Sequence, residues 1–286
     1  MKGAEIIVEA LVRAGIRFVA GVSGDSVLEI LDALYENPAI EYIPVRHEQV
    51  SVSMADGYAR ATGRPMAVLT RVGPGALNLP LGLCNALKDS VPLLAMSGNI
   101  NSVRLGRDAW HDVDVVSTLR PVTKWNTECK SPAEVGEVMR RALMEAAGGR
   151  PGPVHVSFPK DVLSGDARGP EVYEPRDVSV PMERPEPDPE RVEKAVEMFM
   201  EAENPLLFAG GGVQWSDACE ELRAVAETTG APVVTTDSAR GAIPEDHPLS
   251  FGVVGSLGKV TPCEAMRNSD LVLGIGKAEA VLAHTR

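Results

Sequence analysis

Tyr42-Ile43-Pro44-Val45-Arg46-His47-Glu48-Gln49 joins an apolar strand, expected over 42–45, to a helix that continues through Ala55-Asp56-Gly57-Tyr58-Ala59-Arg60. The apolar positions of this helix are expected to share one face: Val50, Met54 and Tyr58. In an open parallel α/β sheet, ligands bind just beyond the carboxyl ends of the strands. Glu48 therefore stands where an acid or base could meet a small molecule. The alternative is structural, because a carboxylate in a first helical turn also suits the positive end of the helix.

Two further apolar stretches, 66–70 and 93–96, follow along the chain, and the first runs into Gly73-Pro74-Gly75-Ala76-Leu77-Asn78. Other elements expected in the first 169 residues are helices at 3–14 and 27–35 and strands at 18–21 and 154–158. Near-continuous apolar strands separated by helices indicate an α/β fold, in which helices cover both faces of a doubly wound parallel sheet. The glycines after the strand permit either a ligand close to the backbone or only a tight turn.

With these motifs the chain resembles the pyrimidine-binding domain of the thiamine-diphosphate enzymes, in the branch of acetolactate synthase and the related 2-keto acid decarboxylases. The resemblance continues through 83–92, 120–124, 149–154 and 159–162. It implies that Glu48 hydrogen-bonds the N1′ nitrogen of the cofactor's aminopyrimidine and so promotes removal of the proton on the thiazolium C2 carbon. It further implies cofactor contacts for three loop residues: Gly73, Gly75 and Asn78.

A carboxyl group in this role has to hold or share a proton near neutral pH. Burial among apolar side chains favours that state, whereas the N-terminus of a helix opposes it. The sequence offers apolar neighbours for Glu48 in Val45, Val50 and Val52. Which effect prevails is left open by the sequence.

Two loops are expected on the substrate side of this site. The resemblance places three residues of the first loop there: Gly24, Asp25 and Ser26. Ser26 could equally cap the following helix. The segment 106–114 aligns with the family's substrate-facing loop, and here Trp110 and His111 replace the Phe-Gln pair of typical acetolactate synthases. Histidine can move protons at neutral pH, so we predict a catalytic role for His111, with a surface hydrogen-bonding role as the alternative.

The composition changes after residue 169. Prolines at 170, 175, 181, 185, 187 and 189, mixed with charged residues, indicate an extended connector over 170–188. Asp188 and Pro189 then supply an N-cap and a first-turn proline for a new helix. A second domain is expected over 189–286, with a helix near 218–229 and strands at 206–209, 232–235 and 271–275.

This second domain resembles the Rossmann-like central domain of the family, which holds FAD in some members and is a spacer in others. A nicotinamide site is disfavoured, because Trp215 stands where the third glycine of that fingerprint would follow the turn 210–212. An apolar strand at 271–275 needs neighbours and covering helices, so we expect this domain to be incomplete.

The family's Gly-Asp-Gly segment, which binds the diphosphate and Mg²⁺, is not in the sequence. A missing domain or a partner chain would supply that half of the cofactor site.

The formal net charge of −12 and the scattered basic residues disfavour nucleic acid and anionic membranes as partners. The N-terminal segment has the pattern of an amphipathic helix, and no apolar run approaches about 20 residues, which predicts a cytoplasmic protein. The scattered cysteines at 84, 129, 219 and 263 form no metal-binding pattern and are expected to be buried. His155 lies inside an apolar strand and is expected to be a core residue, and His247 and His284 carry no predicted role.

The resemblance implies thiamine-diphosphate-dependent decarboxylation of a 2-keto acid such as pyruvate, with carboligation, as in the large subunit of acetolactate synthase. The alternatives are a simple 2-keto acid decarboxylase and a non-catalytic partner subunit without the diphosphate-binding domain. A homodimer, a homotetramer or a complex with a separate diphosphate-binding subunit is expected. No metal ligand is assigned within this chain, and FAD is a candidate second cofactor.

Overall fold

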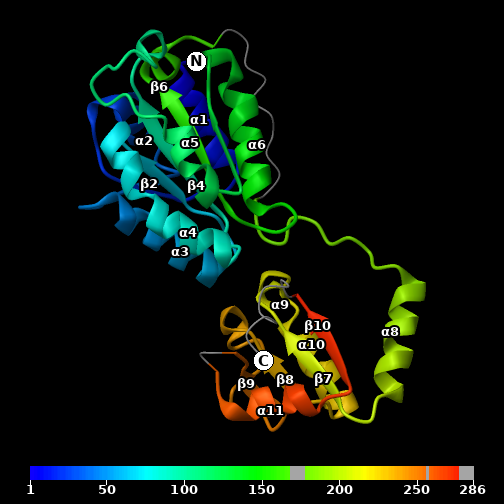
Figure 1. Cartoon of the computed structure of the whole chain (residues 1–286). Helices are drawn as coiled ribbons and strands as arrows, with labels where there is room; N and C mark the ends of the chain where they lie inside the picture. The colour runs from blue at the N-terminus through cyan, green and yellow to red at the C-terminus, as the bar shows by residue number, and fades with distance from the viewer. Residues whose placement is uncertain (168–177, 256–257, 277–286) are drawn as a thin grey trace. The chain divides into compact units, whose positions relative to one another are not determined.

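The computed structural model describes residues 1–167, 178–255 and 258–276. The chain divides into two compact units, Met1–Glu183 and Arg184–Arg286 (Figure 1). The connector expected at 170–188 lies partly outside the described residues. Val178, the first described residue after that gap, is buried in the core of the first unit, and the amide of Val180 donates to the carbonyl of Gly63 at 3.0 Å.

The first unit contains a six-stranded sheet. Its strands are β1 (Phe18–Gly21), β2 (Glu41–Pro44), β3 (Ala67–Thr70), β4 (Leu93–Asn99), β5 (Trp125–Glu128) and β6 (Pro153–Pro159). They lie in the order β2-β1-β3-β4-β6-β5, and each neighbouring pair is parallel. All carboxyl ends therefore meet at one edge. Because the chain proceeds from β1 to β2 on one side and to β3 on the other, the switch point of the topology lies between β1 and β3.

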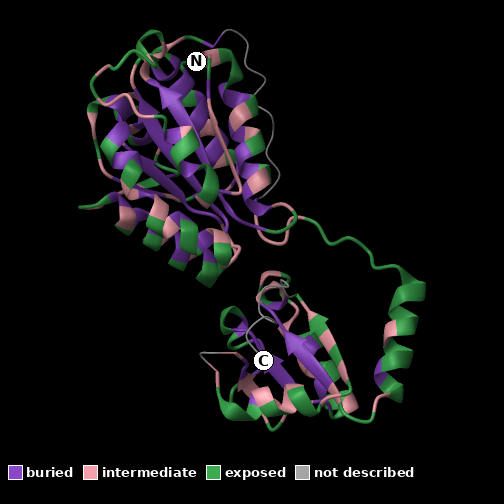
Figure 2. Ribbon diagram, in the orientation of Figure 1, coloured by how far each residue is buried: buried purple, intermediate pink, exposed green. Residues whose placement is uncertain are grey.

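Helices cover both faces of this sheet, as predicted. They are α1 (Gly3–Arg13), α2 (Leu28–Tyr35), α3 (Glu48–Thr62), α4 (Pro80–Lys88), α5 (Val115–Leu119), α6 (Val135–Ala147) and α7 (Lys160–Ser164). Residues of α1, α2, α6 and α7 share one core with Ala67, Leu69 and Phe158, whereas α3 packs on α4 and against β1 and β3 (Figure 1). Figure 2 shows that the inner strands are buried, as expected of a covered parallel sheet, whereas the edge strands β2 and β5 are half-buried or exposed.

The buried face of α3 differs from the one predicted. Val50 is 47% exposed, and the fully buried apolar residues are Val52, Ala55 and Ala59. A glycine on the facing helix lets α3 approach α4 closely, since a Cβ on Gly82 of α4 would come within 2.6 Å of Val52. Tyr58 is half-buried and meets the ring of Phe18 edge-on at 5.4 Å. Close packing, rather than the largest apolar side chains, therefore sets the orientation of α3.

The second unit is also α/β. Its strands β7 (Pro205–Ala209), β8 (Val233–Thr235), β9 (Ser250–Val253) and β10 (Leu271–Ile275) form a parallel sheet in the order β10-β7-β8-β9. Its helices are α8 (Pro189–Glu201), α9 (Gly212–Trp215), α10 (Cys219–Thr229) and α11 (Val260–Asn268). Asp188 caps α8 by accepting from the amide of Glu190, as predicted. Figure 2 shows α8 largely exposed, with Phe199 as its buried residue.

The glycine turn 210–212 has a packing reason that needs no dinucleotide. The amide of Gly212 donates to the carbonyl of Gly276 at 2.8 Å, and a Cβ on Gly212 would lie 2.7 Å from the Cα of Gly276. Two backbones thus approach too closely for a side chain, as is common where glycine follows a strand.

The expectation that every cysteine is buried is wrong. Cys129 is buried, which raises the pKa of its thiol to about 12, but Cys84 is exposed on α4 and Cys219 and Cys263 are half-buried. Cys84 lies on the outer side of a surface helix, where a small apolar residue costs little. In the parts of the chain that the structure describes, no helix has the length and apolar character required to cross a bilayer. His284 lies outside the described residues.

Candidate functional site

Glu48 is the first residue of α3, directly after the turn that leaves β2. The preceding His47 adopts an extended backbone, and its Nδ1 accepts a hydrogen bond from the amide of Gln49, so it caps the helix. This geometry fixes Glu48 at the carboxyl edge of the sheet with only 6% of its surface exposed. A carboxylate at that position is buried yet adjacent to the edge where ligands bind.

The loop after β3 encloses this carboxylate. The amide nitrogen Nδ2 of Asn78 donates to Oε2 of Glu48 at 2.8 Å. A Cβ added to Gly75 would come within 2.9 Å of Oε1 of Glu48, so only glycine leaves the carboxylate where it is. The predicted neighbours Val45 and Val50 do not provide the burial, because Val45 is half-buried and Val50 faces solvent. The contacts of the carboxylate come instead from Gly75 and Asn78 in the glycine-rich loop 73–78.

The structure also brings the His111 loop to the same place. Gly73 has a φ of 56°, a conformation that favours glycine, and a Cβ there would lie 2.8 Å from the carbonyl oxygen and 3.2 Å from the Cβ of His111. His111 itself has a φ of 66°, in the left-handed region. Two segments separated by more than thirty residues therefore meet through backbone contacts that leave no room for a side chain on Gly73.

The loops after β1 and β3 meet at the switch point of the sheet. Ser26 is buried, and its Oγ accepts a hydrogen bond from the amide of Val72 at 3.0 Å. Ser26 therefore joins two loops, a role beyond the helix cap considered from the sequence. Gly24 packs against the side chain of Arg71, whose Cβ would lie 2.9 Å from a Cβ on that glycine.

Two predicted residues are not brought to the carboxylate. Trp110 is 80% exposed, and its ring meets that of His111 edge-on at 5.1 Å. Asp25 is exposed in a 3₁₀ turn over Asp25–Val27. The structure thus groups Glu48, Gly75 and Asn78 in one cluster, with Gly73 and His111 beside it.

Sequence reasoning missed three polar residues at the same edge: Arg71, Asn99 and Glu128. Nδ2 of Asn99 donates to Oε2 of Glu128 at 2.9 Å, and burial is the main cause that raises the pKa of Glu128 above its usual range. Asn99 and Glu128 line a pocket of about 510 Å³ together with residues of the segment 105–116. Their position in the sequence could have identified them, because each of the three residues ends or directly follows a parallel strand, at the edge where ligands bind.

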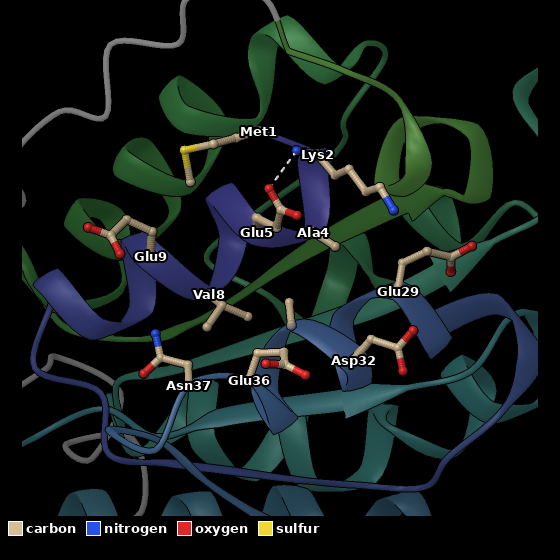
Figure 3. A pocket seen from close by; sticks show the side chains of 11 residues that line it. Met1, Lys2, Ala4, Glu5, Val8, Glu9, Glu29, Asp32, Glu36 and Asn37 are labelled. Atoms are coloured by element: carbon tan, nitrogen blue, oxygen red, sulfur yellow. Dashed lines mark hydrogen bonds between the residues drawn. The ribbon is translucent and has the colours of Figure 1, made fainter.

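A different groove, of about 420 Å³, lies between α1 and α2 (Figure 3). Its charged lining residues are five carboxylates and one lysine, namely Glu5, Glu9, Glu29, Asp32, Glu36 and Lys2. None of the predicted site residues lines it. Among the described residues, no group of three or more His, Cys, Asp or Glu side chains is arranged to hold a metal ion.

Two family models match the chain in the order in which the two units occur. Residues 1–118 match the N-terminal TPP binding domain of the thiamine pyrophosphate enzymes, and residues 192–283 match the central domain of the same enzymes. The chain belongs to the thiamine pyrophosphate enzyme family. The resemblance inferred from the motifs around Glu48 is thereby confirmed, and so is the α/β fold with two parallel sheets.

Curated relatives of this family member align over nearly all of its length. The chain is 39% identical to the probable acetolactate synthase large subunit of Methanocaldococcus jannaschii and 40% identical to the acetolactate synthase large subunit of Corynebacterium glutamicum. It is 36% identical to the acetolactate synthase isozyme 3 large subunit of Escherichia coli. Each alignment covers 96% of this chain but 47%, 44% and 48% of the respective relative. The chain spans about half the length of the curated relatives it matches.

The residues around Glu48 fit the pyrimidine end of the family's cofactor. The fit rests on a buried carboxylate held by Asn78 and on two glycines, Gly73 and Gly75, at which a Cβ would fill the space beside it. A flat heterocycle needs a backbone surface without side chains, and its ring nitrogen needs an acidic partner.

Proposed function

We propose that this chain provides the pyrimidine-binding half of a thiamine-diphosphate-dependent enzyme that decarboxylates a 2-keto acid such as pyruvate and joins the product to a second carbonyl compound. The supporting observation is the buried Glu48 carboxylate, held by Asn78 and set against Gly75 at the carboxyl edge of a doubly wound sheet. The identity with acetolactate synthase large subunits along 96% of the chain favours carboligation as the overall reaction.

Thiamine diphosphate, when bound, supplies a C2 carbon that adds to the keto group of the substrate. The residues of this chain transfer protons and exclude water from the site. Oε2 of Glu48 is occupied by Asn78, and we assign to Oε1, the oxygen next to Gly75, the proton shared with a ring nitrogen of the cofactor. Burial of that carboxyl group keeps water from competing for the proton.

We assign His111 to proton transfer on the substrate side. Its backbone lies against Gly73, and its imidazole stands beside the exposed ring of Trp110. An imidazole can both give and accept a proton near neutral pH. After CO2 is lost, the same substrate carbon can take a proton or bond to the second carbonyl compound, so His111 also bears on which product is released.

The diphosphate and its Mg²⁺ would be held by a second segment, in a longer polypeptide or in a partner chain. Support comes from the relatives, which are about twice as long as this chain. The second unit would act as the central domain, with FAD as a candidate ligand. If that segment belongs to a longer polypeptide, a homodimer or homotetramer would bring the two halves of the site together.

The second candidate function is simple decarboxylation of a 2-keto acid, and the histidine in the 106–114 loop favours it. Product analysis distinguishes the two, because a decarboxylase releases a free aldehyde and a carboligase releases a hydroxyketo acid. The third candidate is a non-catalytic partner subunit. Pyruvate consumption that appears only when a diphosphate-binding chain is added would assign this chain to the catalytic enzyme.

The experiment that tests the proposal is proton–deuterium exchange at C2 of thiamine diphosphate in the assembled enzyme. Glu48→Gln keeps the shape of the side chain but removes the titratable oxygen, so exchange should slow by about two or more orders of magnitude. Glu197→Gln, an exposed substitution on α8, is the matched control and should leave exchange unchanged. Exchange at the wild-type rate in Glu48→Gln would contradict the proposal.

A further inference from the structure

The switch point of the first sheet carries a cation that the proposed function does not use. Arg71 follows β3 directly, and its Nε is buried with no hydrogen-bond partner among the described residues. Leaving a buried N–H group without a hydrogen-bond partner destabilises the fold, and more so when the group is charged. Such a group at the ligand-binding edge of a sheet is expected to gain its partner from a ligand.

Arg71 lies between the two loops that the switch point brings together. A Cβ on Gly24, in the loop after β1, would come within 2.9 Å of the Arg71 Cβ and 3.5 Å of its Nε. A Cβ on Gly75, in the loop after β3, would come within 2.7 Å of the Arg71 Cγ. Glycine at both positions therefore leaves space for this one side chain. The arginine stem is fixed by its neighbours before any ligand binds.

Arg71 is next to Glu48 but is not its partner. Oε1 of Glu48 and Cγ of Arg71 both come within 3 Å of the position that a Cβ on Gly75 would take. The Glu48 carboxylate nevertheless takes its hydrogen bond from Asn78, and no ion pair within the described part of the chain joins it to Arg71. The Nε of Arg71 is thus a hydrogen-bond donor without a partner in the described part of the chain, a short distance from the carboxyl group that handles the proton.

We propose that Arg71 binds the carboxylate of the 2-keto acid substrate. This inference rests on the proposed function. A guanidinium is permanently charged and presents a planar fork that matches a carboxylate, and pairing in a partly buried site gives a strong, oriented hydrogen bond. Binding the carboxylate between the Gly24 and Gly75 loops would orient the keto carbon toward the cofactor. Arg71 would then select 2-keto acids over neutral aldehydes and ketones.

The test is steady-state kinetics with pyruvate in the assembled enzyme. Arg71→Gln should raise the KM for pyruvate by about tenfold to a hundredfold, the scale of one lost charge-assisted hydrogen bond. Arg71→Lys keeps the positive charge but not the planar guanidinium, so its KM for pyruvate should lie between that of the wild type and that of Arg71→Gln. Arg104→Gln, an exposed arginine at the same edge of the sheet, is the matched control and should keep the wild-type KM. C2 exchange in the absence of pyruvate should be unchanged in all three variants.

A second measurement separates binding from packing. The ¹⁵Nε resonance of Arg71, assigned by its loss in Arg71→Lys, should shift with added pyruvate and stay in place with the neutral methyl ester of pyruvate. A KM rise without a pyruvate-dependent shift would assign the effect to packing and overturn the inference. An unchanged KM in Arg71→Gln overturns it whatever the resonance does, and so does an equal shift with the methyl ester.

The two proposals fail in different ways. If Arg71→Gln keeps the wild-type KM while Glu48→Gln stops C2 exchange, only the substrate assignment of Arg71 is wrong. If Glu48→Gln leaves C2 exchange intact, the proposed function is wrong, and a pyruvate-dependent shift at Arg71 would then describe a carboxylate site of another kind.

Discussion

Asn78 donates a 2.8 Å hydrogen bond to Glu48 across 30 positions of the chain. The donor stands at the end of the 3₁₀ segment Gly73–Asn78, and the acceptor stands at the start of α3. The conformation of the glycine loop therefore sets the orientation of the carboxylate. A change in the loop is expected to act on the chemistry of Glu48 without touching Glu48 itself.

Replacing Asn78 by alanine tests this relationship. Asn78→Ala removes the donor but leaves the carboxyl group titratable, so C2 exchange should slow by about tenfold, less than in Glu48→Gln. Asn268→Ala, an exposed substitution at the end of α11, is the control and should have no effect. Exchange in Asn78→Ala as slow as in Glu48→Gln, or as fast as in wild type, would argue against a positioning role.

A pair of glycine substitutions tests the packing around the carboxylate. A Cβ on Gly75 would lie 2.6 Å from Oγ1 of Thr70, 2.7 Å from Cγ of Arg71 and 2.9 Å from Oε1 of Glu48, so Gly75→Ala must displace these groups or the loop itself. We expect destabilisation by about 1–3 kcal/mol and at least tenfold slower C2 exchange. Gly57→Ala is the matched control, because Gly57 lies within α3 with no atom within 4 Å of its added Cβ.

Gly57→Ala should stabilise the protein by about 0.5–1 kcal/mol, since alanine loses less backbone entropy than glycine in a helix interior. Urea unfolding of the two variants measures both effects. Similar unfolding free energies and exchange rates in the two variants would show that Gly75 is not packed against the carboxylate.

His111→Asn tests the catalytic role of the imidazole. Asparagine tolerates a positive φ better than most residues, so it removes the imidazole while preserving the left-handed backbone at 66°. Turnover should fall and its pH dependence should change, while C2 exchange through Glu48 is preserved. The ratio of free aldehyde to ligated product should also change. Wild-type turnover with an unaltered pH profile would leave His111 as a loop residue only.

Most strands of the two units could be predicted because they are near-continuous apolar runs. The expected strand at 18–21 has the observed bounds of β1, and the expected strand at 271–275 has those of β10. In contrast, β5 has the polar sequence Trp125-Asn126-Thr127-Glu128 and β9 contains Gly252 with a φ of 95°. Half-buried edge strands of this kind carry no apolar run, so the sequence pattern did not predict them.

The candidate site could also be predicted only in part. Glu48, Gly75 and Asn78 were predicted because they belong to motifs with a fixed local order, and the structure groups them. The partner of each residue could not be predicted, because it depends on contacts across the sheet edge. Arg71 is the clearest case, since a single arginine after a strand is ordinary in sequence. Only the fold shows that two glycines make space for it.

His155 gives the fold a dependence on pH. Its side chain is fully buried, its Nε2 lies 2.9 Å from Oγ of Ser97, and burial lowers its pKa from 6.5 to about 3. A group whose pKa is lower in the folded state than in the unfolded state stabilises the fold fully above its unfolded pKa. This stabilisation is lost as the pH falls from the unfolded pKa to the folded pKa.

The free energy of unfolding of the wild type should therefore decrease as the pH falls from 6.5 to 3. His155→Gln retains a polar partner for Ser97 but cannot titrate, so its unfolding free energy should decrease less over the same range. Urea unfolding of both proteins at several pH values measures the difference, and equal pH dependence in the two would show that His155 does not carry it.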